Sequence, residues 1–141
     1  MPDLIVFPDI DTYARNLLNQ ELPAHGITGI PVGTKMPNER PARYIRCYTL
    51  PGRELCRRTQ WVQVIARIYD DAQHEVRCAH TAQIVAAVLR AAPDSVVDGE
   101  QPISGPCEKH GPYPIEDPDV PGIPCYQVVL TWTVQSTVKT S

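Results

Sequence analysis

The segment Tyr126-Gln-Val-Val-Leu-Thr-Trp-Thr-Val134, near the end of a 141-residue chain, places a large apolar side chain at every second position. Most of the residues between these positions are polar, as Gln127, Thr131 and Thr133 show. A period of two residues with one apolar face is typical of a half-buried strand in an antiparallel sheet. We therefore predict such a strand over residues 125–138.

Upstream of this strand, two further segments are rich in β-branched and aromatic residues. Residues 43–50 predict one strand, and residues 61–69, Trp-Val-Gln-Val-Ile-Ala-Arg-Ile-Tyr, predict a more buried one. The residues between them, 51–60, are predicted to form a loop. Shorter patches at residues 28–34 and 96–105 are candidates for edge strands.

Two segments have apolar residues at spacings of three and four, which predicts amphipathic helices. The first covers residues 9–22 and ends before Pro23, and the second covers residues 70–92 and ends before Pro93. Each begins with aspartate, which suits the positive end of a helix dipole. This order of elements predicts a single α+β domain over residues 1–141, with a mostly antiparallel sheet packed with two helices.

Seven of the 15 prolines fall within residues 102–124. Because proline lacks an amide hydrogen and has a fixed backbone angle, this segment is predicted to be neither a helix nor a central strand. We expect a long, stiff, irregular proline-rich loop before the last strand. Since proline lowers the entropy lost when a segment is fixed against a partner, we expect this loop to be ordered and to contact a partner.

The composition excludes several classes of protein. Lys and Arg number 13 against 16 Asp and Glu, a formal net charge of -3, whereas proteins that bind duplex DNA carry a basic excess. The apolar runs are far shorter than the roughly 20 residues that cross a bilayer. The five cysteines are odd in number and irregularly spaced, which favours reduced thiols. We expect a soluble protein made in the cytoplasm, with no membrane association.

Cysteine and histidine residues, which are zinc ligands, gather at two places, His74-Cys78-His80 and Cys107-His110. On a helix, however, His80 lies about 200° around the axis from Cys78, and the sequence holds no Cys-x-x-Cys pair. The grouped carboxylates lack the spacing of an EF-hand, and the eight glycines form no phosphate-binding motif. We expect no metal and no cofactor.

Cys107 and His110 could also form a nucleophile and its base, which leaves a small thiol hydrolase as a remote alternative. The sequence contains no Gly-x-Ser-x-Gly motif. We therefore expect no catalytic residues and a protein that is not an enzyme.

Three arginines, Arg53, Arg57 and Arg58, fall within six residues and lie near Leu50 and Leu55. Arginine binds carboxylates and phosphates through paired hydrogen bonds, and a mixture of arginine with apolar side chains is typical of protein interfaces. A solvated hairpin would have the same composition. In this chain of modest acidic charge, the mixture favours a protein partner.

The layout of the whole chain resembles the tail terminator (tail completion) proteins of long-tailed phages, especially those of actinobacterial hosts. The resemblance lies in the order of four segments: Met1-Pro-Asp-Leu-Ile-Val-Phe-Pro-Asp-Ile10 before a helix, Tyr69-Asp-Asp-Ala72 before a helix ending Ala86-Ala-Val-Leu-Arg90, a proline-rich stretch from Gly105 to Pro124, and the final strand from Tyr126.

This resemblance implies a structural virion protein at the tail-neck junction, assembled in the host cytoplasm. It implies a homo-hexameric ring that caps the tail tube, ends its polymerisation and joins it to head-completion or connector proteins. Genomic DNA would pass through the lumen without specific binding, which suits a mildly acidic subunit. A head-closure or head-tail adaptor protein of the neck is the nearest alternative.

No catalytic residue is implied by the resemblance. From their chemistry and from the proline-rich segment, we expect six residues to contact a neighbouring subunit or the tail tube: Arg53, Arg57, Arg58, Pro112, Pro114 and Pro118.

Overall fold

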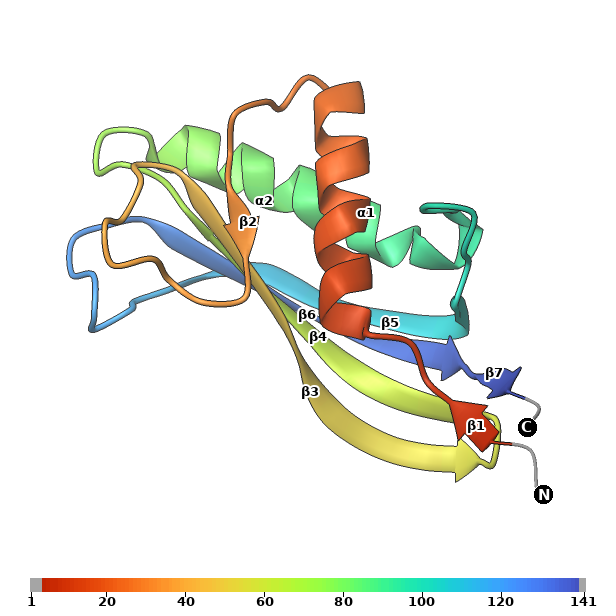
Figure 1. Ribbon diagram of the computed structural model, residues 1–141. Coiled ribbons are helices and arrows are strands. Elements are labelled where there is room, and N and C mark those ends of the chain that lie inside the picture. The colour runs from red at the N-terminus through yellow and green to blue at the C-terminus, as the bar shows by residue number, and fades with distance from the viewer. Residues whose placement is uncertain (1–3, 140–141) are drawn as a thin grey trace.

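The computed structural model describes residues 4–139, so the first three and last two residues of the expected domain lie outside the described part (Figure 1). Its helices and strands confirm the predicted α+β class. In chain order they are β1 (Leu4–Val6), α1 (Ile10–Ala24), β2 (Val32–Gly33), β3 (Tyr44–Cys56), β4 (Thr59–Tyr69), α2 (Glu75–Arg90), the 3-10 helix η1 (Ala92–Asp94), β5 (Ile103–Ile115), β6 (Cys125–Gln135) and β7 (Thr137–Lys139).

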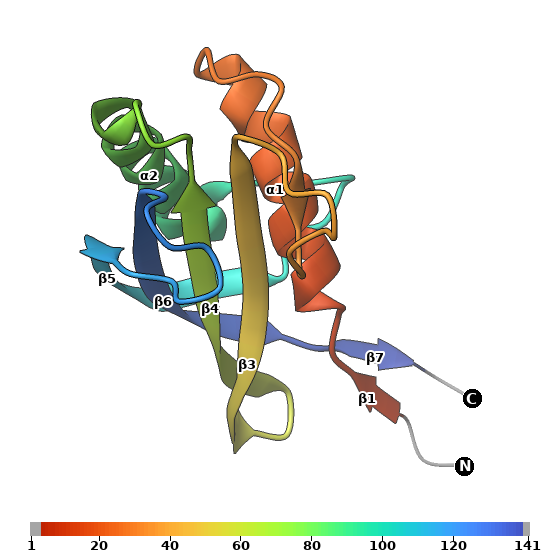
Figure 2. The same cartoon turned by 90° about the vertical axis from the view of Figure 1, so that its left-hand side faces the viewer.

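Five strands form the main sheet in the order β2-β3-β4-β6-β5, and every neighbouring pair is antiparallel except β2 and β3. Both helices pack on the same face of this sheet (Figures 1 and 2). The apolar side of β6 supplies the middle of the core, where Trp132 is fully buried. The Trp132 indole donates a hydrogen bond to the carbonyl oxygen of Leu89 at 3.0 Å and meets the ring of Tyr13 edge to face. The strand predicted from its period of two is therefore confirmed over residues 125–135 as the strand beneath the helices. Its predicted end at residue 138 is wrong, because the chain leaves the main sheet after Gln135 and β7 pairs with β1 in a second sheet.

Helix α1 matches its prediction closely. Asp9 is the N-cap, and its carboxylate accepts a hydrogen bond from the backbone N–H of Thr12 at 3.2 Å. Pro23 lies inside the last turn instead of ending the helix before it, since the chain continues in helical form to Ala24. A proline so close to the end removes one backbone bond without breaking the earlier turns.

Helix α2 begins at Glu75, so its predicted start at residue 70 is wrong. The Asp70 carboxylate accepts hydrogen bonds from the Arg77 side chain and from the backbone N–H of Asp71. Asp71 in turn accepts from the backbone N–H of Gln73. These local bonds hold the chain in a turn ahead of the helix, which is a common role of aspartate.

The predicted loop over residues 51–60 is also wrong, because β3 continues to Cys56 and β4 begins at Thr59. The two strands pair almost to their ends and leave only Arg57 and Arg58 in the turn. Two register shifts, one on either side of Arg53, accommodate this part of β3. The segment is thus a long hairpin whose end extends beyond the helices (Figure 2).

The irregular loop expected over residues 102–124 is wrong for residues 103–115, which form the edge strand β5. Its pairing with β6 shifts register between Ser104 and Glu108 and again between His110 and Tyr113. Pro106 falls in the first of these shifts and Pro112 in the second. Prolines are tolerated at bulges of edge strands because no ladder hydrogen bond is lost there. Only residues 116–124 form the irregular connection before β6.

Strands β1 and β7 pair antiparallel as a separate two-stranded ribbon, which brings the two ends of the chain together beside the main sheet (Figure 2). Leu4 on this ribbon is 59% exposed.

Candidate interface surfaces

Residues 116–124 fold back over the sheet and build a second, smaller apolar cluster. By the alternation of strand side chains, Tyr44, Tyr69 and Cys125 lie side by side on the face away from the helices. Val120 of the connecting segment packs against these three residues and is itself buried. The segment is therefore fixed to the sheet by apolar contacts.

A polar anchor centred on Asp117 holds the same segment. The Tyr69 hydroxyl donates to the Asp117 carboxylate at 2.7 Å, and Arg67 lies 3.9 Å from it. Within the segment, the backbone N–H of Asp119 donates to the other carboxylate oxygen at 3.0 Å. The hydrogen bond from Tyr69 lowers the pKa of Asp117, while burial and this same hydrogen bond raise the pKa of Tyr69. Asp117 is therefore held as a carboxylate that accepts bonds from both the sheet and its own loop.

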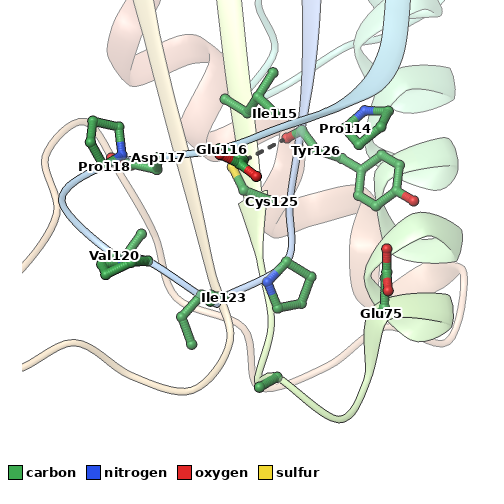
Figure 3. A pocket seen from close by; sticks show the side chains of 14 residues that line it. Glu75, Pro114, Ile115, Glu116, Asp117, Pro118, Val120, Ile123, Cys125 and Tyr126 are labelled. Atoms are coloured by element: carbon green, nitrogen blue, oxygen red, sulfur yellow. Dashed lines mark hydrogen bonds between the residues drawn. The ribbon is translucent and has the colours of Figure 1, made fainter.

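A pocket of about 750 Å³ opens between this connecting segment and the start of α2 (Figure 3). We call it the acidic pocket, because three carboxylates belong to its lining and no Lys or Arg of the described chain does. The lining residues are Ala72, Glu75, Pro114, Ile115, Glu116, Asp117, Pro118, Val120, Pro121, Gly122, Ile123, Pro124, Cys125 and Tyr126. Most of the lining residues are proline or other apolar residues, so the pocket combines apolar walls with three carboxylates.

The end of the β3–β4 hairpin, residues 53–58, is the second surface, and we call it the hairpin tip. All six residues are exposed, and Leu55 at 50% is among the most exposed large apolar side chains of the described residues. The residue just before the tip is Gly52, and no larger residue fits there because a Cβ would collide with the backbone and ring of Trp61. Within the tip, a hydrogen bond with the Thr59 side chain lowers the pKa of the exposed Cys56 thiol.

The six residues expected at an interface separate into different places. Arg53, Arg57 and Arg58 lie together at the hairpin tip, whereas Pro114 and Pro118 line the acidic pocket. Pro112 belongs to the bulged part of β5 and does not line the pocket. Strand β4 separates the tip from the pocket with its 11 residues, a distance of about 33 Å at roughly 3.3 Å per residue.

Sequence reasoning missed the contribution of Glu75 and Glu116 to one site. Both are exposed, but one opens α2 and the other follows β5. In the sequence, only the run Glu116-Asp117-Pro-Asp119 next to prolines indicates an acidic surface at this place.

Asp70, Asp71 and His74 place potential ligand atoms within 4.8 Å of one another. Asp70 is 1% exposed, and Arg77 holds both of its oxygens, at 2.8 and 2.5 Å. Although burial raises the pKa of Asp70, the hydrogen bonds from Arg77 and from the Asp71 backbone lower it overall. Because Arg77 binds both oxygens of the Asp70 carboxylate, Asp70, Asp71, His74 and Arg77 form an ion-pair network that fixes the start of α2.

The other cysteine and histidine candidates are dispersed. Cys78 is buried, and its thiol donates to the carbonyl oxygen of Ile68 at 3.2 Å, whereas His80 is exposed. Cys107 is buried, while His110 is exposed and stacks edge to face on Tyr113. Burial raises the pKa of Cys107, an environment that does not activate a thiol as a nucleophile.

No protein-family model matches the sequence, and no curated protein matches it. Among the described residues, neither helix combines the length and the apolar character that crossing a membrane requires.

Proposed function

We propose that the protein is a structural subunit of a phage virion, a tail terminator that forms a hexameric ring on the end of the tail tube. The ring would stop tube polymerisation and join the tail to the head-completion proteins. The resemblance in element order and loop placement motivates this proposal.

The observation that carries the proposal is the hairpin tip. A two-stranded ribbon that leaves the core contributes little to the core itself, yet this one holds Leu50 and Leu55 at 42% and 50% exposure beside Arg53. Exposed leucines next to arginines are typical of surfaces that become buried against another protein. Such projecting elements suit a subunit whose work is assembly.

The test is the mass and shape of the purified full-length protein. Six copies of the 15.7 kDa chain give about 94 kDa by light scattering, and negative-stain images should show six-fold rings with an open centre. Added to growing tubes of the tail-tube protein from the same genome, the protein should bind one end and stop elongation.

A head-closure or head-tail adaptor protein would instead bind portal-bearing heads and leave tube growth unchanged. Binding to neither tubes nor heads would overturn the assignment to the virion.

A further inference from the structure

We infer that the hairpin tip of one copy docks in the acidic pocket of a second copy, so that subunits associate head to tail. This inference rests on the proposed ring and names the contact that would build it.

Charge complementarity identifies the occupant of the pocket. The tip carries Arg53, Arg57 and Arg58 against the single acidic residue Glu54. On the pocket side, Glu75 and Glu116 are exposed on the rim, whereas Asp117 already faces Tyr69 and Arg67. Arginine forms paired, geometrically defined hydrogen bonds with carboxylates, which gives such a contact direction as well as attraction.

The apolar surfaces also match. Leu55 lies between Arg53 and Arg57 in the sequence and is half exposed, while the residues that line the pocket include Ile123 and Tyr126 (Figure 3). The volume of about 750 Å³ is within the range of roughly 300–1,000 Å³ typical of pockets that enclose a ligand. Because prolines and the Asp117 anchor fix the connecting segment, little entropy is lost when a partner binds.

Geometry makes this contact intermolecular. The tip and the pocket lie at opposite ends of β4, about 33 Å apart along an 11-residue strand, so one copy cannot satisfy both of its surfaces. Two different surfaces that bind each other across copies form a heterologous interface, which closes into a ring when the rotation per subunit divides a full turn. One pair of surfaces would therefore suffice to propagate the whole ring.

The decisive experiment exchanges the charges of the two surfaces. Arg53→Glu with Arg58→Glu makes the tip acidic, and Glu75→Lys with Glu116→Lys makes the pocket rim basic. Each variant should self-associate at least about tenfold more weakly than wild type in sedimentation velocity at about 0.01 M ionic strength, where charges are little screened. A one-to-one mixture should associate again, because every tip then meets a pocket of opposite charge.

The matched control is Arg15→Glu with Arg40→Glu, which changes the net charge equally at exposed positions elsewhere. It should leave association unchanged. Retention of wild-type association by either surface variant, or failure of the mixture to recover, would overturn the inference.

A second measurement detects the contact directly. Cys56 at the tip is exposed, and the other four cysteines are buried, so Glu116→Cys adds one accessible partner thiol. Mild oxidation should then give a ladder of disulfide-linked multimers, whereas the control Gln83→Cys on the exposed face of α2 should not. Equal ladders from both variants, or none from Glu116→Cys, count against docking.

These outcomes separate the inference from the proposed function. Six-fold rings that persist in both surface variants would refute tip-to-pocket docking while leaving a ring-forming terminator intact. Head-to-tail oligomers that bind neither tail tubes nor heads would support the docking and refute the virion role.

Discussion

Removal of the Tyr69 hydroxyl by Tyr69→Phe should loosen the connecting segment that walls the acidic pocket. The hydroxyl donates to the Asp117 carboxylate at 2.7 Å from a tyrosine that is 1% exposed. A hydrogen bond to a charged group contributes about 1.5–3 kcal/mol to stability. At 2–4 °C per kcal/mol for a chain of this size, a loss of about 2 kcal/mol lowers Tm by roughly 4–8 °C.

The loss should depend on pH, because the hydrogen bond from Tyr69 lowers the pKa of Asp117 in the folded protein. A carboxyl whose folded pKa lies below its unfolded value stabilises the protein above the unfolded pKa, near 3.8, and loses that contribution as pH falls through the folded value. The difference between wild type and Tyr69→Phe should therefore be full at pH 7 and shrink in strong acid.

Urea unfolding at pH 7 and at about pH 3 measures this difference, and hydrogen exchange follows residues 116–124. Tyr113→Phe is the matched control, because the Tyr113 hydroxyl accepts a hydrogen bond from the neutral Gln127 side chain at 2.7 Å. Tyr113→Phe should lower the free energy of unfolding by about 1 kcal/mol, and this loss should not change with pH. An equal effect of Tyr69→Phe at both pH values, or unchanged exchange in the segment, would refute the role given to Asp117.

Three further predictions test the core, the ion-pair network and the tip. Trp132→Ala should lower the free energy of unfolding by about 3–5 kcal/mol in urea titrations, because it empties the centre of the core and removes the hydrogen bond from the indole to the Leu89 carbonyl. Asp70→Asn should lower the free energy of unfolding by about 3 kcal/mol, since it leaves Arg43 and Arg77 without their buried partner, whereas the same change at the partly exposed Asp71 should have a much smaller effect. In native protein, Ellman's reagent should modify Cys56 alone and reach the other thiols only on unfolding.

The parts of the fold that could be predicted from the sequence are those where one face is buried. In strand β6 and in helix α1 the apolar residues recur with a regular period, because in each element they face the same core. The hairpin beyond Leu50 has no buried face, so its side chains follow no apolar period and the sequence resembles a loop. Backbone pairing alone, which leaves no such pattern, extends β3 to Cys56.

Strand β5 was missed for a different physical reason. Its prolines exclude a central strand, and that expectation agrees with its place at the edge of the sheet. The inference from many prolines to irregular structure failed because the register shifts coincide with Pro106 and Pro112. A single sequence does not reveal where a ladder shifts register, since the shift depends on the partner strand β6 as well.

The acidic pocket could not be predicted from the sequence either, because its residues come together only in the folded chain. Pro114 and Pro118 were expected at an interface from composition. The carboxylates Glu75 and Glu116, however, are 41 positions apart in the sequence and line one pocket only because α2 begins where β5 ends. The arginines could be recognised in the sequence because they are adjacent in the chain. The basic residues of the hairpin tip are close together in the sequence, whereas the acidic residues of the pocket come from separate segments. Each copy therefore has one basic and one acidic surface, at opposite ends of β4. Under the proposed docking, one surface of each kind per copy is the minimum that head-to-tail assembly requires.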